Sequence, residues 1–314
     1  MGVTVDLSVR GRMRAQPALV VSGVRIMVRG RALRIGEIFD EYWLERSSLP
    51  DAGKLITALR AMPDRPDIFT FAQRVPDSAP GHPYYRETDN VAVLPIRSFE
   101  QWLAKQCTAA TRRNVKAAEK RGITVREVRY DDAFVRGIKE IYDETPFRAG
   151  RRFWHYGKDL ESVRRENATY AERSSYLAAH HGENFVGYLK VVWDSETGAI
   201  MQILSKLGYR DSRPNNALLA MAVRLAAERG VRYLLYEKFE YGRKGADSLT
   251  QFKERSGFRR MDIPRYFVPL TVKGSIALKL QLHRGLRDRV PEAVAAPLRE
   301  MRSRLVSRLA STQE

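Results

Sequence analysis

The segment at residues 236–242 places two carboxylates and two phenols within seven positions, in the order Tyr-Glu-Lys-Phe-Glu-Tyr-Gly. It lies at the end of the hydrophobic run 231–237, which predicts a buried strand. A carboxylate can accept a proton and a phenol can donate one, so this strand end has both parts of general acid–base chemistry. Glu237 is the candidate proton acceptor and Tyr241 the candidate proton donor. Packing at the rim of a sheet is the other interpretation.

A second segment, 148–158, combines cations, aromatic rings and a single histidine without helical or strand periodicity, which predicts a loop. Guanidinium groups can clamp an anion while aromatic rings stack on a sugar or a base. Arg148, Arg152 and Tyr156 are therefore candidate acceptor-binding residues. His155 is a further candidate proton acceptor, because imidazole titrates near neutral pH. A structural role for this histidine is the other interpretation.

A third segment, 208–216, reads Gly-Tyr-Arg-Asp-Ser-Arg-Pro-Asn-Asn and precedes the predicted helix 215–229. Helix N-termini and arginine side chains both bind phosphate, although Pro214 has no backbone N–H to offer. The loop is either an anion site or a simple helix start with Asn215 as its cap.

Composition favours a folded protein with an anionic partner. The chain has 314 residues, 44% of them hydrophobic, and a net charge of +18. Residues 101–314 hold 41 lysines and arginines against 25 acidic residues, an excess of 16. A field of this sign favours nucleic acid, coenzyme phosphates or anionic membranes, or it serves solubility alone.

The sequence carries no signature of a secreted, membrane-spanning or metal-binding protein. Cys107 is the only cysteine, and no His/Cys cluster has metal-ligand spacing, so we expect a reducing, cytoplasmic location and no metal. No apolar run approaches the roughly 20 residues that a membrane-spanning helix needs.

Hydrophobic periodicity predicts a small β-rich unit first. Its expected elements are strands 18–28 and 32–39, helix 51–62, and strands 67–74 and 90–96. A long helix over 98–122 follows, with Ser98 and Gln101 as a capping box and Gly122 as the stop. This helix carries a basic stripe, which is either a solvated face or a nucleic-acid contact: Lys105, Arg112, Lys116 and Lys120, beside Arg113 and Arg121.

From residue 123 the predicted elements alternate in a definite order. Strand 123–129 and helices 131–142 and 159–172 lead to an antiparallel meander of strands 176–181, 184–193 and 199–207, followed by helix 215–229, strand 231–237, helix 247–255 and strand 258–270. The tail from residue 273 is predicted to be helical, and Pro291 opens its second helix. That tail either docks on the protein or lies at an anionic lipid surface.

This succession resembles the GNAT acyltransferase fold over about residues 98–272. The stretches 112–122 and 249–258 are similar to the corresponding parts of Fem-type transferases and BioF2-like acetyltransferases. The resemblance implies an α/β (α+β) fold with a mixed, largely antiparallel twisted sheet and flanking helices. It also implies three parts: a small N-terminal unit, 1–97, built like a truncated GNAT half; the acyltransferase domain, 98–272; and a basic helical tail, 273–314.

The resemblance further implies an N-acyltransferase acting on an amine of a small molecule or of a bacterial cell-envelope precursor. The donor would be acyl-CoA, such as acetyl-CoA, or aminoacyl-tRNA. The substituted glycines of the 208–216 loop depart from the usual acetyl-CoA pattern and leave room for a different donor, such as aminoacyl-tRNA. Glu237, Tyr241 and His155 would serve catalysis, Lys253 would contact the acceptor, and the donor would be held by Gln202, Ser205, Arg210, Arg213, Asn215 and Asn216. The alternatives are a non-catalytic RNA-binding protein and a membrane-peripheral protein on a degenerate GNAT scaffold.

Overall fold

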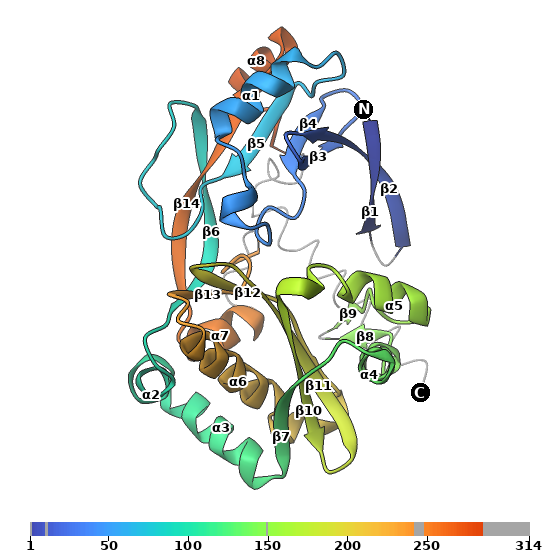
Figure 1. Cartoon of the computed structure of the whole chain (residues 1–314), viewed down its shortest axis with the longest axis vertical. Helices are drawn as coiled ribbons and strands as arrows, with labels where there is room; N and C mark the ends of the chain where they lie inside the picture. Colours follow the sequence, from blue (N-terminus) through green and yellow to red (C-terminus); the bar gives the residue numbers. More distant parts are fainter. Residues whose placement is uncertain (1, 10–11, 149, 242–247, 285–314) are drawn as a thin grey trace. The chain divides into compact units, whose positions relative to one another are not determined.

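A computed structural model describes residues 2–9, 12–148, 150–241 and 248–284 of the chain (Figure 1). Contacts divide the chain into two compact units. The first comprises residues 1–89, 147–152 and those from 262 onward, and the second comprises residues 90–146 and 153–261. The first unit is therefore assembled from parts that are distant in sequence. The three-part division at 97/98 and 272/273 stays a prediction.

The first unit is a sheet in the order β1-β2-β3-β4-β5-β14, with neighbours antiparallel except for the parallel pair β4 and β5. Two helices pack on it, and their apolar residues share its core. The elements are β1 (Gly2–Val9), β2 (Arg12–Val21), β3 (Val24–Arg29), β4 (Ile35–Ile38), the short helix η1 (Arg46–Ser48), α1 (Ala52–Ala61), β5 (Ile68–Ala72), β14 (Arg259–Pro269), which enters the unit at residue 262, and α8 (Val272–Lys279).

The strand predicted over 18–28 is wrong, because the chain reverses within it. Val21 pairs with Val24, so β2 and β3 form a hairpin with a two-residue turn. The turn residues Ser22 and Gly23 have φ of +49° and +81°, the left-handed pair that matches the twist of a hairpin. The small Ser-Gly pair was the missed turn signal.

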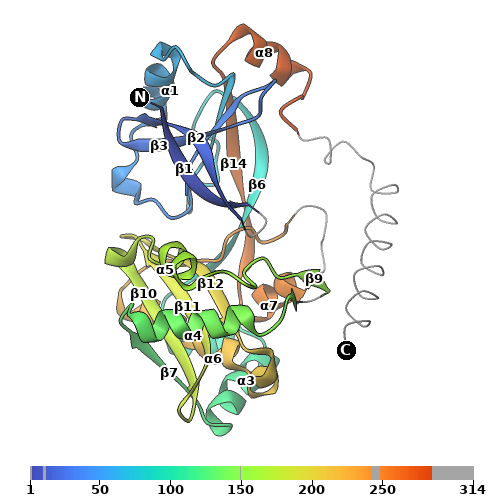
Figure 2. The same ribbon diagram turned by 90° about the vertical axis from the view of Figure 1, so that its right-hand side faces the viewer.

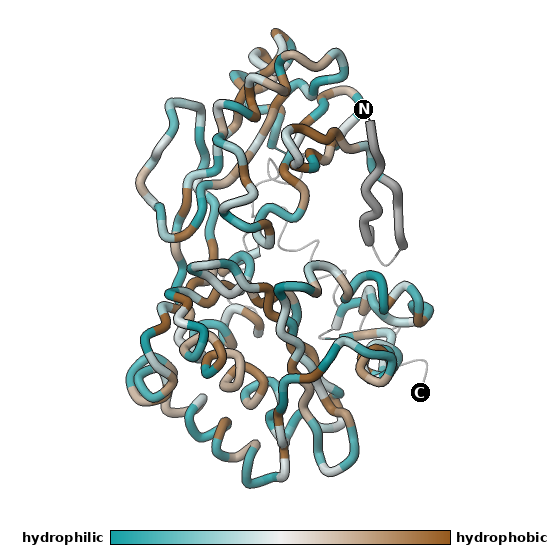
Figure 3. Tube along the Cα trace, in the orientation of Figure 1, coloured by the Kyte–Doolittle hydropathy of each residue, from teal (hydrophilic) through white to brown (hydrophobic). Residues whose placement is uncertain are grey.

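The second unit is a sheet in the order β6-β13-β12-β11-β10-β7, with α3 and α6 on one face and α4 and α5 on the other (Figures 1 and 2). Hydrophobic residues, brown in Figure 3, line the meander strands. The elements are β6 (Tyr85–Pro95), which belongs to this unit from residue 90, α2 (Phe99–Gln101), η2 (Trp102–Gln106), α3 (Ala109–Lys120), β7 (Ile123–Val128), α4 (Asp132–Asp143), α5 (Leu160–Asn167), η3 (Ala171–Arg173), β10 (Ser174–His181), β11 (Asn184–Trp193), β12 (Thr197–Ser205), η4 (Leu207–Ser212), α6 (Pro214–Glu228), β13 (Tyr233–Leu235) and α7 (Ser248–Arg255).

The predicted meander and its continuation are confirmed. β10 pairs with β11 and β11 with β12, both antiparallel, and α6 then leads to β13, which lies parallel to β12. Helix α5 ends at Asn167, five residues before the predicted end. A separate two-stranded ladder joins β8 (Phe147–Arg148) to β9 (Arg151–Arg152).

The single helix predicted over 98–122 is wrong in its middle. Ser98 caps the first turn as expected, but the π-helical segment η2 ends at Cys107, which has ψ of +157°, and Thr108 caps a new helix, α3. The Thr108 N–H donates to the Arg255 carbonyl at 2.9 Å, and the Trp102 indole donates to the Ser256 carbonyl at 2.8 Å. These contacts with the chain after α7 hold the break in place.

The break also divides the predicted basic stripe. The Arg112 guanidinium donates to the carbonyls of Leu103 and Cys107, so it serves the C-terminal end of η2. Arg113, Lys116 and Lys120 remain exposed along one face of α3, at spacings of three and four residues.

The tail begins with α8, which is shorter and earlier than the predicted helix, and the helix predicted from Pro291 lies outside the described residues. Within the described ranges, no helix has the length and hydropathy required to cross a bilayer.

Replacing Thr108 by alanine distinguishes the broken helix from a continuous one. Alanine inside a continuous helix would stabilise the fold. Loss of the cap on Thr111 N–H should instead lower the free energy of unfolding by about 1 kcal/mol, measured by urea denaturation. Thr108→Ser retains the capping oxygen, so its free energy of unfolding should stay close to that of the wild type. A stabilised Thr108→Ala variant would contradict the break.

Candidate active site

The candidate site begins where β12 and β13 part. Only three residue pairs join these strands, the last being Ala199 with Leu235. β12 continues beside β11 as far as the pair of Ser205 with Gly187. The chain after β13 instead follows β6, since Tyr236 N–H donates to the Ala92 carbonyl at 3.0 Å. The two strands therefore separate because each keeps its other neighbour.

The edge of β12 that faces the parting is irregular. Lys190 pairs with Gln202 and Val191 with Ile200, so Met201 is an extra residue in β12. From Ile200 onward, no described strand pairs with β12 on the β13 side. Backbone N–H and C=O groups of residues 200–204 on this edge can therefore pair with a ligand.

Glu237 and Tyr241 lie beside each other directly after β13. The Ala92 N–H donates to the Glu237 carbonyl at 2.8 Å, and the Tyr241 hydroxyl donates to the Glu237 carboxylate. Glu237 has φ of +45°, an uncommon conformation for a residue other than glycine that is often found at functional sites. Burial raises the pKa of the Glu237 carboxyl, and the hydrogen bond from Tyr241 and the charge of Lys253 oppose this rise.

Lys253 reaches the same group from α7. Its side chain is fully buried, and its ammonium donates to the Lys238 carbonyl at 2.5 Å. The ammonium nitrogen lies 4.6 Å from the ring centroid of Tyr236 and 5.0 Å from that of Tyr241. Lys253 thus packs against the segment that carries Glu237. Its contact with an acceptor stays a prediction.

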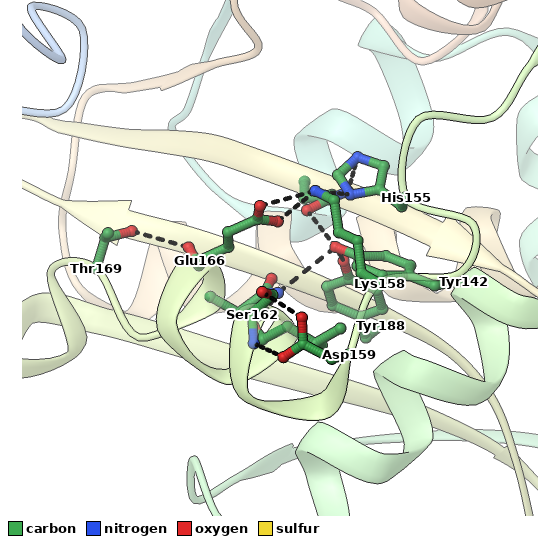
Figure 4. Close-up of polar contacts among 11 residues, drawn as sticks. Tyr142, His155, Lys158, Asp159, Ser162, Glu166, Thr169 and Tyr188 are labelled. Carbon is green, nitrogen blue, oxygen red and sulfur yellow. Dashed lines mark hydrogen bonds and ion pairs between the residues drawn. The ribbon is translucent and has the colours of Figure 1, made fainter. Parts of the chain in front are cut away.

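His155 lies in a separate polar network between the loop after β9, α5 and the meander (Figure 4). Its Nδ1 is 3.3 Å from the Lys158 ammonium, which forms an ion pair with Glu166 at 2.6 Å. Its Nε2 is 3.4 Å from the side-chain amide of Gln202 on β12. The ring also packs on Tyr142, with 4.3 Å between the ring centroids.

The network constrains the histidine. An ammonium only donates hydrogen bonds, so Nδ1 can bond to Lys158 only as an acceptor. The Gln202 amide nitrogen, which faces Nε2, is also a donor, and the Gln202 amide oxygen faces Tyr142. A neutral imidazole has one acceptor nitrogen, so it can accept from Lys158 or from Gln202 but not from both at once. The role of His155 as a proton acceptor stays a prediction.

Gln202 also contacts the network through Tyr142, whose hydroxyl is 3.3 Å from the Gln202 amide oxygen and 2.9 Å from the Tyr188 hydroxyl. Sequence reasoning missed Tyr142, Lys158 and Glu166. No local pattern joins them, because α4, α5 and the loop before α5 meet only in the folded chain.

The loop before α6 differs from a backbone cradle for phosphate. The N–H groups of Leu207 and Gly208 already donate to the Glu144 carboxylate, at 2.7 and 3.1 Å. Pro214 occupies the first helical position, and the Asn216 N–H donates to the Arg213 carbonyl at 3.0 Å. These backbone groups therefore do not fit the pyrophosphate of a coenzyme A bound in the usual GNAT manner.

The side chains of this loop were predicted to hold the donor, and that role stays a prediction. Arg213, and not Asn215, is the N-cap residue, with φ of +59° and no side-chain cap. The Asn215 amide oxygen is buried and has no hydrogen-bond partner in the part of the chain that the structure describes. Arg210 is exposed, and the Arg121 guanidinium donates to the Asp211 carbonyl, which joins the end of α3 to the loop.

The other predicted site residues are dispersed. Ser205 is buried at the end of β12, and Tyr156 is 48% exposed in the loop before α5. Arg148 and Arg152 belong to the β8–β9 ladder. The structure therefore brings Glu237 together with Tyr241 and Lys253, and His155 together with Gln202. Within the described ranges, no three His, Cys, Asp or Glu side chains converge as a metal site would require.

No protein-family model and no curated protein sequence matches this chain. The solved structures that are similar to it include the following three. The C-terminal DUF2156 domain of a protein assigned as a lysylphosphatidylglycerol synthetase, from Agrobacterium fabrum, has a TM-score of 0.55 at 12% identity and covers 84% of this chain and 87% of its own. The structure of FemX has a TM-score of 0.55 at 11% identity, and the match covers 88% of this chain and 90% of the FemX chain. L-PGS from Bacillus licheniformis has a TM-score of 0.53 at 12% identity, and the match covers 85% of this chain and 88% of the L-PGS chain.

The fold is GNAT-like. It is the mixed, largely antiparallel sheet with flanking helices that the sequence predicted, and at these identities the likeness establishes the fold alone. Within this GNAT-like fold, the parting of β12 and β13 and the loop before α6 are the positions where the resemblance implied a site.

The buried ion pair of Lys158 and Glu166 should affect the free energy of unfolding far more than a surface ion pair does. Glu166→Gln leaves the ammonium of Lys158, whose side chain is 6% exposed, without a countercharge and should lower the free energy of unfolding by about 3 kcal/mol. Glu196→Gln, which breaks the exposed pair with Arg232, is the matched control and should cost less than about 1 kcal/mol. Equal effects in urea denaturation would show that the Lys158 pair is not buried in solution.

The pKa of Glu237 should lie above the ordinary glutamate value of 4.5, because burial disfavours the carboxylate. Tyr241→Phe removes a hydrogen bond to the charged form and should raise this pKa further. ¹³C NMR of a chain labelled at the glutamate carboxyl carbons measures both values, with Glu237→Gln assigning the signal. Tyr209→Phe is the control that should leave the pKa unchanged. A lower pKa in Tyr241→Phe would contradict the described contact.

Proposed function

We propose that the chain is an N-acyltransferase that joins an acyl group from an anionic carrier to an amine. The observation that carries this proposal is the pairing of Glu237 with Tyr241 directly beside the point where β12 and β13 part. The GNAT-like fold supports it, since the sequence resemblance implies an acyl donor at this position. The strained backbone of Glu237 supports it further, because such strain concentrates at functional sites.

In the proposed reaction, the amine attacks the acyl carbonyl carbon and loses a proton to the Glu237 carboxylate. The new C–N bond forms, and the bond from the carbonyl carbon to the carrier oxygen or sulfur breaks. Tyr241 donates its hydroxyl proton to the departing atom and regains one from Glu237 through their hydrogen bond. Backbone N–H groups on the unpaired edge of β12 stabilise the negative charge on the carbonyl oxygen.

For the donor we propose aminoacyl-tRNA in preference to acyl-CoA. Glu144 and Pro214 leave few backbone N–H groups for a pyrophosphate, as described above. Two side chains of the loop, Arg210 and Arg213, offer guanidinium groups for phosphate. The exposed cations of α3 extend this positive surface, because Arg121 links the end of α3 to the loop. A long polyanion can use the whole surface, whereas coenzyme A would use only part of it.

The acceptor is proposed to be the amine of a cell-envelope precursor or of a small metabolite in the cytoplasm. Tyr156, in the second unit, offers a ring for this acceptor, and the proposed role of Arg148 and Arg152 in binding an anionic acceptor rests on the sequence alone. The similar structure named as a lysylphosphatidylglycerol synthetase supports an envelope component.

A non-catalytic RNA-binding protein is the second candidate, favoured by the row of Arg113, Lys116 and Lys120 on α3. Both candidates predict salt-sensitive RNA binding. Only the transferase predicts loss of the acyl group from charged tRNA in the presence of an amine.

The test incubates the full chain with aminoacyl-tRNA or acetyl-CoA and a panel of amines, and follows the acyl group by mass spectrometry. Glu237→Gln should bind donor like the wild type and lose at least about 100-fold in rate. Arg210→Ala with Arg213→Gly should weaken donor binding by about tenfold per arginine, with the exposed Arg126→Ala as control. Salt-sensitive RNA binding without acyl transfer would replace the transferase by the second candidate.

A further inference from the structure

Helix α8 is apolar on two faces, although only one of them packs against residues that the structure describes. Its inner face contributes Gly274, Ala277 and Leu278, which are buried against the first unit's sheet. Its outer face presents Val272, Ile276 and Leu280, spaced by four residues and therefore on one side of the helix. We call these three residues the outer face of α8. A contiguous apolar face that the rest of the described protein leaves uncovered is typical of an interaction surface.

The exposure of the outer face is unusual for this molecule. Val272 is 79% exposed, Leu280 62% and Ile276 54%, and these are the three most exposed large hydrophobic residues in the described part of the chain. Leu282, directly after the helix, is 47% exposed. Exposed apolar residues scattered singly are ordinary, but a contiguous group marks an interaction surface.

The orientation of this face is determined by tight packing on the inner side. A Cβ atom on Gly274 would lie 1.9 Å from the Asp67 carbonyl oxygen, so only glycine allows the helix to approach the sheet so closely. The Thr271 hydroxyl caps the helix through the Gly274 N–H at 3.0 Å, and Lys273 pairs with Asp67 at 3.0 Å. The helix therefore cannot rotate to bury the outer face.

The charges around the outer face have one sign. The acidic side chains that face α8 and its C-terminal end, Asp67 and Glu87, are engaged by Lys273 and by His283 and Arg284 respectively. Lys279 is exposed and forms no ion pair with a described residue. The sequence from residue 285 onward adds six arginines against four acidic residues.

We propose that the outer face of α8 rests on an anionic lipid surface. Val272, Ile276 and Leu280 enter the boundary between headgroups and acyl chains, while Lys279 beside them pairs with lipid phosphates. This combination of an apolar face and surrounding cations is what an interfacial helix needs for reversible attachment. The proposal is independent of acyl transfer, since it places no residue of the candidate active site at the membrane.

Vesicle flotation of the full chain tests the proposal. The vesicles contain phosphatidylcholine, either alone or with phosphatidylglycerol. The wild type should float with the anionic vesicles only, and less at high salt. The variant Val272→Ser, Ile276→Ser, Leu280→Ser keeps every charge and should lose at least about tenfold in partitioning, because partitioning depends on apolar contact as well as charge.

The matched control replaces three other exposed apolar residues, Val20→Ser, Leu160→Ser and Leu207→Ser, and should float like the wild type. Thermal unfolding and size-exclusion chromatography of all three proteins complete the test. Equal flotation of the α8 variant would overturn the proposal in favour of attachment by charge alone. A wild type that does not float would also overturn the proposal. If the α8 variant then melts at a lower temperature, the chain's own C-terminal residues cover the outer face of α8. If the α8 variant instead loses a dimer, a second copy of the chain covers that face.

Discussion

The arrangement of the candidate site depends on backbone hydrogen bonding at one place, where β12 and β13 share three residue pairs and then part. Each strand has a second neighbour that continues to satisfy its backbone groups, β11 for β12 and β6 for the chain after β13. The separation therefore leaves only the facing edges unpaired. Glu237 follows directly, and its positive φ accompanies the turn of the chain along β6.

The two faces of the second unit's sheet differ in chemistry. Both faces have an apolar core, and the face covered by α4 and α5 also buries two lysines, Lys158 and Lys190. Lys190, only 1% exposed, donates to the Asn167 carbonyl at 2.9 Å and to the Thr169 hydroxyl at 3.1 Å. Lys158 is neutralised by Glu166 in the same layer. Such groups tolerate burial only in one geometry, so they hold α5 and the loop before it in a defined position.

The loop before α6 illustrates how a shared fold can change its ligand. A glycine-rich loop exposes consecutive N–H groups to a phosphate. Here the Glu144 carboxylate takes two of them, Pro214 removes a third, and arginine occupies the left-handed position before the helix. The groups of this loop that remain for an anion are the side chains of Arg210 and Arg213. This difference is the physical basis of the proposal that the donor is a large polyanion and not coenzyme A.

The amino-acid sequence alone determined the order of the elements from residue 123, the meander, the helix after it and the position of Glu237, because these follow from local periodicity and turn residues. Tertiary contacts decided the rest. The break at Cys107 needs the carbonyl of Arg255, and the network around His155 joins α4, α5 and β12. The carboxylate of Glu144 reaches a loop more than 60 residues away. Partners so distant in sequence leave no periodic signal, since only the packing of the folded chain brings them within hydrogen-bonding distance.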